Sequence, residues 1–535
     1  MPFIAANNGH LNNFYSKTVM DYLNQSPQLQ PFYHYAPTLD GYKQKVAQRT
    51  FSVQQRQLLV EVLQQQYGDL LSDNNPVANN IQALTNENTY TVTTGQQIHI
   101  YLGPLYVVNK ILSTIAQCRW LEENFEGKKF VPVFWMATED HDFEEISHLQ
   151  LFYKQFAWPQ PQDYNGAVGR IAPQSINQLE GEIREVLNND EEAKKLLDLF
   201  TDAYTRYTTL ADATRYIVHQ LFGHEGLVVI DADNTQLKQV LKPYIHNDVF
   251  TGKNFETVNK TSALLEENYK AQIHPREINF FYLTENGRYR LALENGVYKA
   301  LDSQIAFSEE QIKKEIEQHP EHFSPNVVMR PVYQELILPN IAYIGGPAEV
   351  NYWLQLKDCF DANEVQFPII ELRQSIILIN SKIAEKIEGM GFTIADFLQD
   401  AKELEAEFVS KNSSGTPDYS THYKAIEAEL EAIKNKALEV DNNLRPFLEG
   451  EFKKITDTFE KLDAKLDKLE KKKFENQLKQ IENIKTKFFT PHQLAERTDT
   501  VLSAAFLSNQ HNIEALLINI NQQKIPLVIA IPPFE

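Results

Sequence analysis

The chain has 535 residues, of which 42% are hydrophobic, 11% aromatic and 23% charged, and its formal net charge is −21. This composition excludes a disordered polypeptide, and the length leaves room for two to four domains. The negative charge argues against non-specific binding to nucleic acid or to an anionic membrane, because both require a positive protein surface.

The N-terminal part of the chain predicts helices and then the beginning of a sheet. The stretch Ser52–Tyr67 has apolar residues near helical spacing. The β-branched and aromatic run Thr89–Thr94 predicts a strand that stops at Gly95. A helix with apolar periodicity follows from about Leu105 to Phe125, and the apolar run Phe130–Met136 is typical of a parallel strand buried on both faces. The order strand, helix, strand predicts an α/β protein with a doubly wound sheet.

Three further apolar runs predict strands of the same sheet: Leu227–Asp233, Ile341–Ile344 and Phe367–Ile370. Between them lie two insertions, one with a helix over Ile183–Phe200. The other has an alternating stretch, Ile278–Leu301, whose Glu285-Asn286-Gly287 indicates a hairpin turn. We therefore expect the sheet to be assembled from separated pieces of chain.

The C-terminal third predicts a coiled coil. Apolar residues between Ile426 and Leu469 recur at alternating steps of four and three, with a turn between about Val440 and Gly450 that makes the two runs antiparallel. After it, Pro526 and Leu527–Ile531 predict one last strand. The expected organisation is N-terminal helices and the first half of the core (1–150), a helical insertion (151–222), a core continuation (223–250), a second insertion with the hairpin (251–322), the second half of the core (323–384), the coiled coil (385–490) and a segment returning to the core (491–535).

The first candidate binding element lies where the first strand turns into a helix. It combines Thr94-Gly95-Gln96-Gln97 with Gly103-Pro104-Leu105-Tyr106. Gly95 allows a tight turn, Pro104 suits a first helical turn, and a loop before a helix offers N–H groups to an anion. The glycines are too sparse for a dinucleotide fingerprint or a P-loop. A plain βα turn is the alternative. The candidate residues are Gly95, Gln96, Gln97, Gly103, Pro104 and Tyr106.

The second candidate element is Glu139-Asp140-His141-Asp142, at the end of a buried strand. Three carboxylates and an imidazole can bind a cation, orient an amine or supply a general base. Capping of the next helix by Asp140 or Asp142 is the alternative, but it does not account for all four groups. No second His/Cys pair with ligand spacing accompanies His141, so we expect no structural metal. We assign these four residues as catalytic, with His141 as the acid/base candidate.

The remaining candidates follow later strands. Gly345-Gly346-Pro347-Ala348-Glu349 allows close approach of a ligand, and Glu349 is suited to an ammonium group. Asn326 and Arg330 lie in a proline-containing loop, and Arg373 follows another strand. Arginine is suited to carboxylates and phosphates, although a surface ion pair is the alternative for each arginine.

Other features exclude further classes. Neither Cys118 nor Cys359 has a neighbouring histidine, so both are interpreted as buried structural thiols. There is no GxSxG elbow for Ser-His-Asp hydrolysis. No secretory signal and no run of about 18 apolar residues is found, so we expect a soluble, cytoplasmic protein without nucleic-acid or membrane partners.

Taken in order along the chain, these motifs resemble the bacillithiol-biosynthesis cysteine ligase family. The resemblance depends on Thr94–Gln97, Gly103–Tyr106, Pro132–Asp142, Ser324–Pro331 and Tyr343–Glu349. The chain departs from the family in reading Leu494-Ala495-Glu496-Arg497 where Leu-Gln-Glu-Arg is usual, and no KMSKS-like loop is found.

The resemblance implies a Rossmann-like core related to class I aminoacyl-tRNA synthetases and nucleotidyltransferases, and a coiled coil that pairs two protomers. It implies that cysteine is joined to glucosaminyl-malate. Because a carboxylate does not acylate an amine unaided, we expect ATP, with or without Mg²⁺, as the activator. Two alternatives remain at this point: a nucleotidyltransferase-like enzyme with another substrate, and a dimeric scaffold without activity.

Overall fold

The computed structural model describes residues 3–72, 75–152, 154–161, 164–413, 419–490, 494–504, 518 and 524–531. The described residues form two compact units, one within 1–378 and 491–532 and the other within 379–490. No helix in these ranges combines the length and apolar character needed to cross a membrane.

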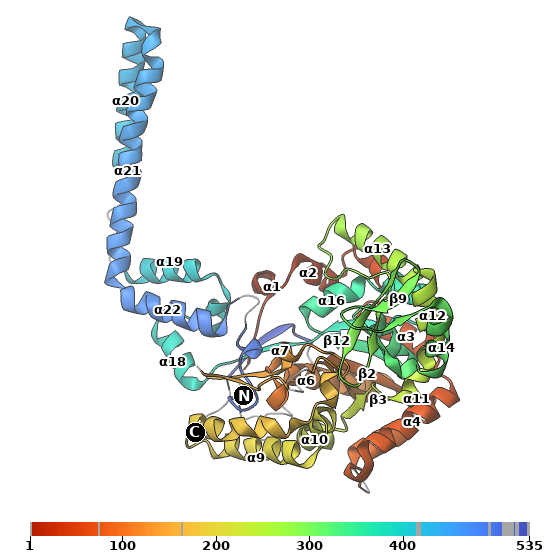
Figure 1. Ribbon diagram of the computed structural model, residues 1–535. Helices are drawn as coiled ribbons and strands as arrows, with labels where there is room; N and C mark the ends of the chain where they lie inside the picture. The colour runs from red at the N-terminus through yellow and green to blue at the C-terminus, as the bar shows by residue number, and fades with distance from the viewer. Residues whose placement is uncertain are drawn as a thin grey trace. The chain divides into compact units, whose positions relative to one another are not determined.

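A five-stranded parallel sheet forms the centre of the first unit (Figure 1). Its strand order is β13 (Ile369–Leu372), β12 (Asn340–Gly345), β2 (Thr89–Gln96), β3 (Lys129–Met136) and β6 (Val228–Asp231). All four neighbouring pairs are parallel. In chain order this is 3-2-1-4-5 when read from β6 to β13, which is five of the six strands of the Rossmann arrangement, and the direction of winding reverses between β2 and β12. The predicted doubly wound sheet is confirmed.

The central strands are buried because their sequences are apolar on both faces. All residues of β3 except Lys129 are buried, as are all of β12. Helix α6 (Tyr106–Asn124) packs against β2 and β3, and α3 (Leu39–Gln48) packs against β12 and β13. The parallel strands thus end at one edge of the sheet, where loops present polar groups.

Smaller sheets surround the central one. An antiparallel sheet has the order β10 (Ala306–Phe307), β9 (Val297–Ala300), β8 (Arg288–Glu294), β7 (Phe280–Leu283) and β11 (Phe323–Pro325). Its β7–β8 pair is the predicted hairpin. The others are β1 (Phe3–Ala5), β15 (Leu527–Ala530) and β14 (Ser375–Leu378), and the pair β4 (His148–Leu151) and β5 (Lys154–Ala157).

The first unit contains further helices besides α3 and α6. They are α1 (Asn8–Phe14), α2 (Lys17–Leu23), α4 (Val53–Tyr67), α5 (Pro76–Ala83), α7 (Phe143–Ile146), α8 (Glu180–Leu187), α9 (Glu191–Arg206), α10 (Leu210–Phe222), α11 (Thr235–Lys238), α12 (Lys242–Thr251), α13 (Lys253–Glu266), α14 (Glu309–Gln318), α15 (Met329–Ile337), α16 (Pro347–Leu354) and α17 (Lys357–Ala362). The single helix expected over 183–200 is two helices. Asn188 ends α8 with a φ of 50°, and the Asp190 side chain caps α9.

The second unit is helical, as predicted. Its helices are α18 (Ser381–Gly389), α19 (Ala401–Asn412), α20 (Ser420–Val440), α21 (Arg445–Lys473) and α22 (Glu475–Phe488). Helices α20 and α21 lie side by side and run antiparallel (Figure 1). Tyr423 of α20 stacks on Phe459 of α21 at a centroid distance of 4.5 Å, and its hydroxyl donates to Asp463.

The cysteine interpretation is also confirmed. Cys118 and Cys359 are free and buried. Burial raises the pKa of the Cys359 thiol to about 12, which leaves the thiol protonated at neutral pH.

Candidate active site

A cavity of about 360 Å³ opens where the winding of the central sheet reverses. This size is within the range of small-molecule sites, and this position is where doubly wound sheets bind ligands. The strands β2, β3 and β12 end at the cavity, and the helices α6, α15 and α16 complete its wall. Its lining residues are Gly95, Gln96, Gln97, Tyr106, Lys110, Trp135, Ala137, Asp140, Glu145, Arg330, Pro331, Gln334, Tyr343, Gly346, Pro347, Ala348, Glu349, Tyr352, Trp353, Arg373 and Arg497.

On the α16 side of the cavity, Glu349 is fully engaged within the chain. Its Oε2 accepts from the Nζ of Lys110 at 2.7 Å and from the N–H of Gly346 at 2.7 Å, and its Oε1 accepts from the Tyr343 hydroxyl at 2.5 Å. Burial acts to raise the pKa of this carboxyl, but Lys110 and Gly346 hold the pKa below its usual value. Within the described residues, the ammonium group that contacts Glu349 is therefore that of Lys110.

Lys110 connects three parts of this wall. Its side chain is 1% exposed, and besides Glu349 it donates to the carbonyl of Gly95 and to Oε1 of Gln96 at 3.2 Å. Burial lowers the pKa of Lys110, and the carboxylate of Glu349 opposes this shift. The buried ion pair fixes the end of β2 against the start of α16.

Arg373 is likewise paired inside the protein. Its Nη2 donates to Glu496 at 2.7 Å, and both side chains are at most 3% exposed. Glu496 also accepts from Asn109 of α6 at 2.6 Å and from the N–H of Ile376 at 3.2 Å. The segment after residue 494 thus reaches the cavity wall, where Arg497 joins the lining.

The β3 side of the cavity is more open. Asp140 accepts from Gln97 at 3.2 Å and from Arg288 at 3.3 Å, and Arg330 lies 3.8 Å from it. Burial acts to raise the pKa of Asp140, but His141, Arg288 and Arg330 hold the pKa well below its usual range. Asp140 and Arg330 thus face the cavity as a carboxylate and a guanidinium that are not in close contact.

Glu145 adds a second carboxyl on this side. It belongs to α7, whose first turn is capped by the side chain of Asp142. Burial raises the pKa of Glu145 above its ordinary value, although Gln97 beside it opposes the shift. A carboxyl with a raised pKa is closer to the neutral range in which a general base works best.

The sequence-predicted residues divide into two groups. The cavity brings together Gly95, Gln96, Gln97, Tyr106, Asp140, Arg330, Gly346, Glu349 and Arg373. The other candidates are not among the lining residues: Gly103, Pro104, Glu139, His141, Asp142, Asn326 and Gly345.

Glu139, Asn326 and Asp142 of the second group have hydrogen-bond or ion-pair partners outside the cavity. Glu139 pairs with Lys238 at 2.5 Å, and Lys238 also contacts Asp233. Asn326 accepts from the N–H groups of Val328 and Met329. The capping alternative therefore holds for Asp142, while Glu139 and Asn326 support the wall from behind.

The imidazole of His141 lies beside the cavity rather than in its lining. Its Nδ1 is 3.1 Å from Nη1 of Arg288 and 3.7 Å from Oδ1 of Asp140, and its ring lies 5.7 Å from that of Phe281. Because a guanidinium is only a donor, this contact makes Nδ1 the acceptor.

Sequence reasoning missed Lys110, Glu145, Arg288 and Arg497 as functional candidates. Lys110 stands within the apolar run of α6, between Val108 and Ile111, and a lone charge at such a position is a usable signal. Arg497 had been noted only as part of the departure from the family string. Neither Glu145 nor Arg288 had a local signal, because tertiary structure places them.

The fold and the cavity together define a Rossmann-like α/β protein with a small-molecule site at its switch point. Family models add the particular family. Residues 5–374 match "Bacillithiol biosynthesis BshC, N-terminal Rossmann-like domain", and residues 376–525 match "Bacillithiol biosynthesis BshC, C-terminal coiled-coil domain". The chain belongs to the BshC family of bacillithiol biosynthesis.

Relatives agree over nearly the whole length. A protein of Flavobacterium johnsoniae is 35% identical over 97% of this chain and 95% of its own. One of Flavobacterium psychrophilum is 37% identical over 91% of both chains, and one of Bacillus cereus is 28% identical over 93% of this chain and 94% of its own. Each is named "Putative cysteine ligase BshC".

A solved structure also matches, titled as that of a putative arginyl-tRNA synthetase from Campylobacter jejuni. It covers 85% of this chain and 99% of its own at 10% identity, with a TM-score of 0.25. At this TM-score the match does not establish a shared fold, so the relation to aminoacyl-tRNA synthetases stays a prediction.

Proposed function

We propose that the chain joins the carboxyl group of cysteine to the amine of glucosaminyl-malate in the cytoplasm, forming the amide bond of bacillithiol. The name of the relatives gives the class of enzyme, which is a ligase. The main support for these substrates is the open side of the cavity, where Asp140 and Glu145 are suited to an ammonium group. Arg330 and Arg497 are suited to the malate carboxylates or to phosphate.

The reaction requires an activated carboxyl, because a carboxylate does not acylate an amine unaided. We propose ATP as the activator: the cysteine carboxylate attacks the α-phosphorus and pyrophosphate leaves. The amine nitrogen then attacks the acyl carbon, AMP leaves, and the nitrogen loses a proton. Holding amine and acyl group in contact supplies up to about 7–11 kcal/mol of the barrier in such reactions.

Two groups are candidates for receiving that proton. Glu145 lines the cavity and has a raised pKa. His141 is the sequence-predicted candidate and lies one residue from Asp140. Glu145→Gln and His141→Ala separate them, because only loss of the proton acceptor removes the acidic limb of the pH–rate profile, which is the fall in rate at low pH.

The test of this function is exchange of labelled pyrophosphate into ATP by the purified full-length protein, with single amino acids added. The proposal expects exchange that depends on cysteine and not on serine. Exchange without any amino acid would instead indicate a nucleotidyltransferase with another substrate. No exchange together with no amide product from cysteine, glucosaminyl-malate and ATP would contradict both.

We further propose that a second copy of the chain covers one face of the α20–α21 hairpin. Ile426, Ile433 and Val440 repeat every seven residues on α20, three positions after the inward-facing Tyr423, Leu430 and Ala437. Ile455, Leu462 and Leu469 stand three positions after Phe452, Phe459 and Leu466 on α21. At 100° per residue, this offset puts both rows on the same side of an antiparallel pair. The six residues are exposed, Ile433 by 52% and Leu462 by 43%, which is unusual for a water-facing surface.

A further inference from the structure

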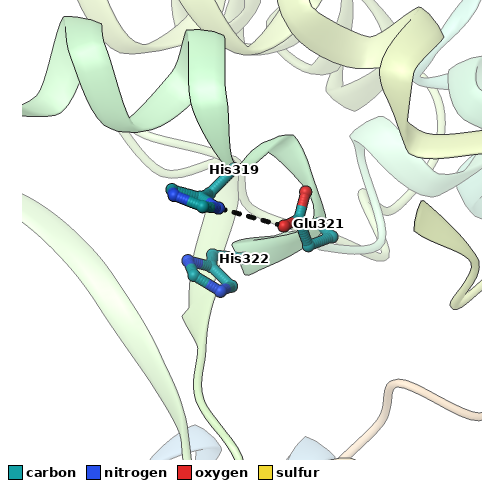
Figure 2. Close-up of side chains that lie close together, drawn as sticks. All are labelled: His319, Glu321 and His322. Atoms are coloured by element: carbon teal, nitrogen blue, oxygen red, sulfur yellow. Dashed lines mark hydrogen bonds and ion pairs between the residues drawn. The ribbon is translucent and has the colours of Figure 1, made fainter. Parts of the chain in front are cut away.

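A cluster of possible metal ligands lies at the end of α14, outside the cavity. His319 follows the helix, and Pro320–His322 form a single turn of 3₁₀ helix before β11. Side chains at positions i and i+3 of a 3₁₀ helix lie above one another. The rings of His319 and His322 accordingly stack with centroids 5.0 Å apart at 16°, and Glu321 lies beside them (Figure 2).

The donor atoms are already close to the spacing that a metal ion requires. One ligand atom from each of His319, Glu321 and His322 lies within 4.8 Å of the other two. Nδ1 of His319 is 3.2 Å from Oε1 of Glu321. Ligands of a tetrahedral Zn²⁺ with bonds of about 2.0–2.1 Å are separated by about 3.3 Å. One edge of the coordination sphere is therefore present, and the ligand atom of His322 has to approach by at most about 1.5 Å.

One oxygen of the Glu321 carboxylate can still accept a hydrogen bond. Its Oε2 is buried and has no hydrogen-bond partner among the residues that the structure describes. Burial acts to raise the pKa of this carboxyl, but a backbone N–H and the two imidazoles hold the pKa below its usual value. Lys238 donates to the carbonyl of Glu321 at 3.0 Å and so fixes its backbone. The other oxygen, Oε1, faces the imidazole of His319 (Figure 2), and a charged carboxylate beside two imidazoles is a position that suits a cation.

A neighbouring residue orients one histidine as in known metal sites. Nδ1 of His322 lies 2.6 Å from Oε1 of Glu315, which also accepts from the hydroxyl of Tyr282 at 2.8 Å. A carboxylate that accepts from one ring nitrogen leaves the other nitrogen deprotonated and raises its basicity toward a metal. Glu315 thus orients a ligand of the cluster without being a ligand itself.

We propose that His319, Glu321 and His322 bind a divalent ion of the zinc type, with water completing its coordination. Two imidazoles and one carboxylate suit Zn²⁺ better than Mg²⁺ or Ca²⁺, which prefer oxygen ligands. This site departs from the expectation of no structural metal, which rested on the lack of a second His/Cys pair with ligand spacing, since His319 and His322 form a His-x-x-His pair.

The bound ion would brace the segment that supports the cavity. His322 directly precedes β11, where Oγ of Ser324 and the carbonyl of Pro325 accept from Arg288 at 3.0 and 3.2 Å. Arg288 in turn contacts Asp140 and His141. The ion therefore has a positioning role, and no step of the reaction uses it.

The test is a competition titration of chelator-treated, full-length protein with Zn²⁺ against a chromogenic chelator at neutral pH. We expect one equivalent to bind and a rise in the melting temperature. The double variant His319→Ala/His322→Ala and the shape-conserving Glu321→Gln should lose this equivalent. Glu315→Gln should bind about 10–100-fold more weakly, as for other outer groups of metal sites. His34→Ala, which removes an exposed histidine paired with Asp361, should bind like the wild type.

Two results would overturn the proposal. One is the absence of any equivalent that competes with the chelator, which would leave His319–Glu321 and His322–Glu315 as ordinary ion pairs. The other is an equivalent retained by both the double variant and Glu321→Gln. Circular dichroism and the metal-free melting temperature show whether each variant is folded, and Glu321→Gln keeps the test decisive if the double variant is not.

Discussion

The two sides of the cavity use their charged groups differently. On the α16 side, Lys110 pairs with Glu349 and Arg373 with Glu496, and three of these four side chains are at most 3% exposed. On the β3 side, Asp140 and Arg330 are 3.8 Å apart and remain partly exposed. The first side is built to hold its own shape, and the second has charge to offer a ligand. Substitutions on the two sides should therefore affect different properties.

The largest expected effect is on stability, at Lys110. Lys110→Met leaves the Glu349 carboxylate without its buried partner and should lower the free energy of unfolding by about 3 kcal/mol. Urea denaturation measures this. Lys195→Met, which breaks an exposed pair with Glu192 at 2.9 Å, is the control and should cost at most about 0.5 kcal/mol. Equal losses for the two variants would contradict the contrast between the sides.

At Arg330 the expected effect is on catalysis. Arg330→Ala removes a guanidinium whose charge-assisted hydrogen bonds to a substrate are worth about 1.5–3 kcal/mol, so kcat/KM should fall about 10–100-fold. The melting temperature should change less than for Lys110→Met, because the 3.8 Å pair of Arg330 with Asp140 is partly exposed. Arg290→Ala, on an exposed position of β8, serves as the matched control. If Arg330→Ala lowers the melting temperature but leaves kcat/KM unchanged, Arg330 stabilises the fold and does not bind substrate.

A smaller, pH-dependent effect on stability is expected at Asp231, at the end of β6. Burial and the neighbouring Asp233 raise the pKa of Asp231 to about 6. A carboxyl whose pKa is higher in the folded than in the unfolded protein destabilises the fold progressively as pH rises between those two values. Asp231→Asn should therefore raise the free energy of unfolding by about 1–2 kcal/mol at pH 8 and change it little at pH 4. A gain of equal size at both pH values would rule out titration of Asp231 as the cause.

Helices α20 and α21 show a similar contrast, because each has one apolar row that packs inside the hairpin and another that is exposed. Substitutions in the exposed rows should have no effect on the cavity. The double variant Ile433→Glu/Leu462→Glu should be a monomer where the wild type is a dimer, as measured by light scattering, because like charges then face each other across the interface. Glutamates at the exposed Lys424 and Lys468 are the control. If both variants stay dimeric, the interface lies elsewhere.

The sequence predicted the central sheet well because its strands are continuous apolar runs. β3 and β12 were located almost to the residue, and the motifs after them were correctly expected to meet, since parallel strands end at one edge. The sequence could not indicate which polar group at that edge points into the cavity. Glu139, Asp140, His141 and Asp142 are consecutive, yet only Asp140 lines the cavity, because Lys238, Arg288 and the start of α7 engage the other three.

The expectation for Glu349 shows the same difficulty. Its position at a strand end was informative, but its ammonium partner came from Lys110, which is distant in sequence and carries no motif. Pairing between separated elements is decided by tertiary packing, which a local pattern does not contain. The helix break at Asn188 was missed for a smaller reason, since its left-handed conformation is set by one residue.

The most direct test of the central claim is the rate of amide formation by Asp140→Asn. Asparagine keeps the shape of the side chain and removes the charge that faces the cavity. The wild-type protein should convert cysteine, glucosaminyl-malate and ATP into the amide, followed by mass spectrometry, and the variant should be slower by at least about tenfold. Because Arg288 and Arg330 hold the pKa of Asp140 below its usual range, the variant also loses some stability, so circular dichroism at the assay temperature has to show that it is folded. A variant that forms the amide at the wild-type rate would show that this cavity is not where the reaction takes place.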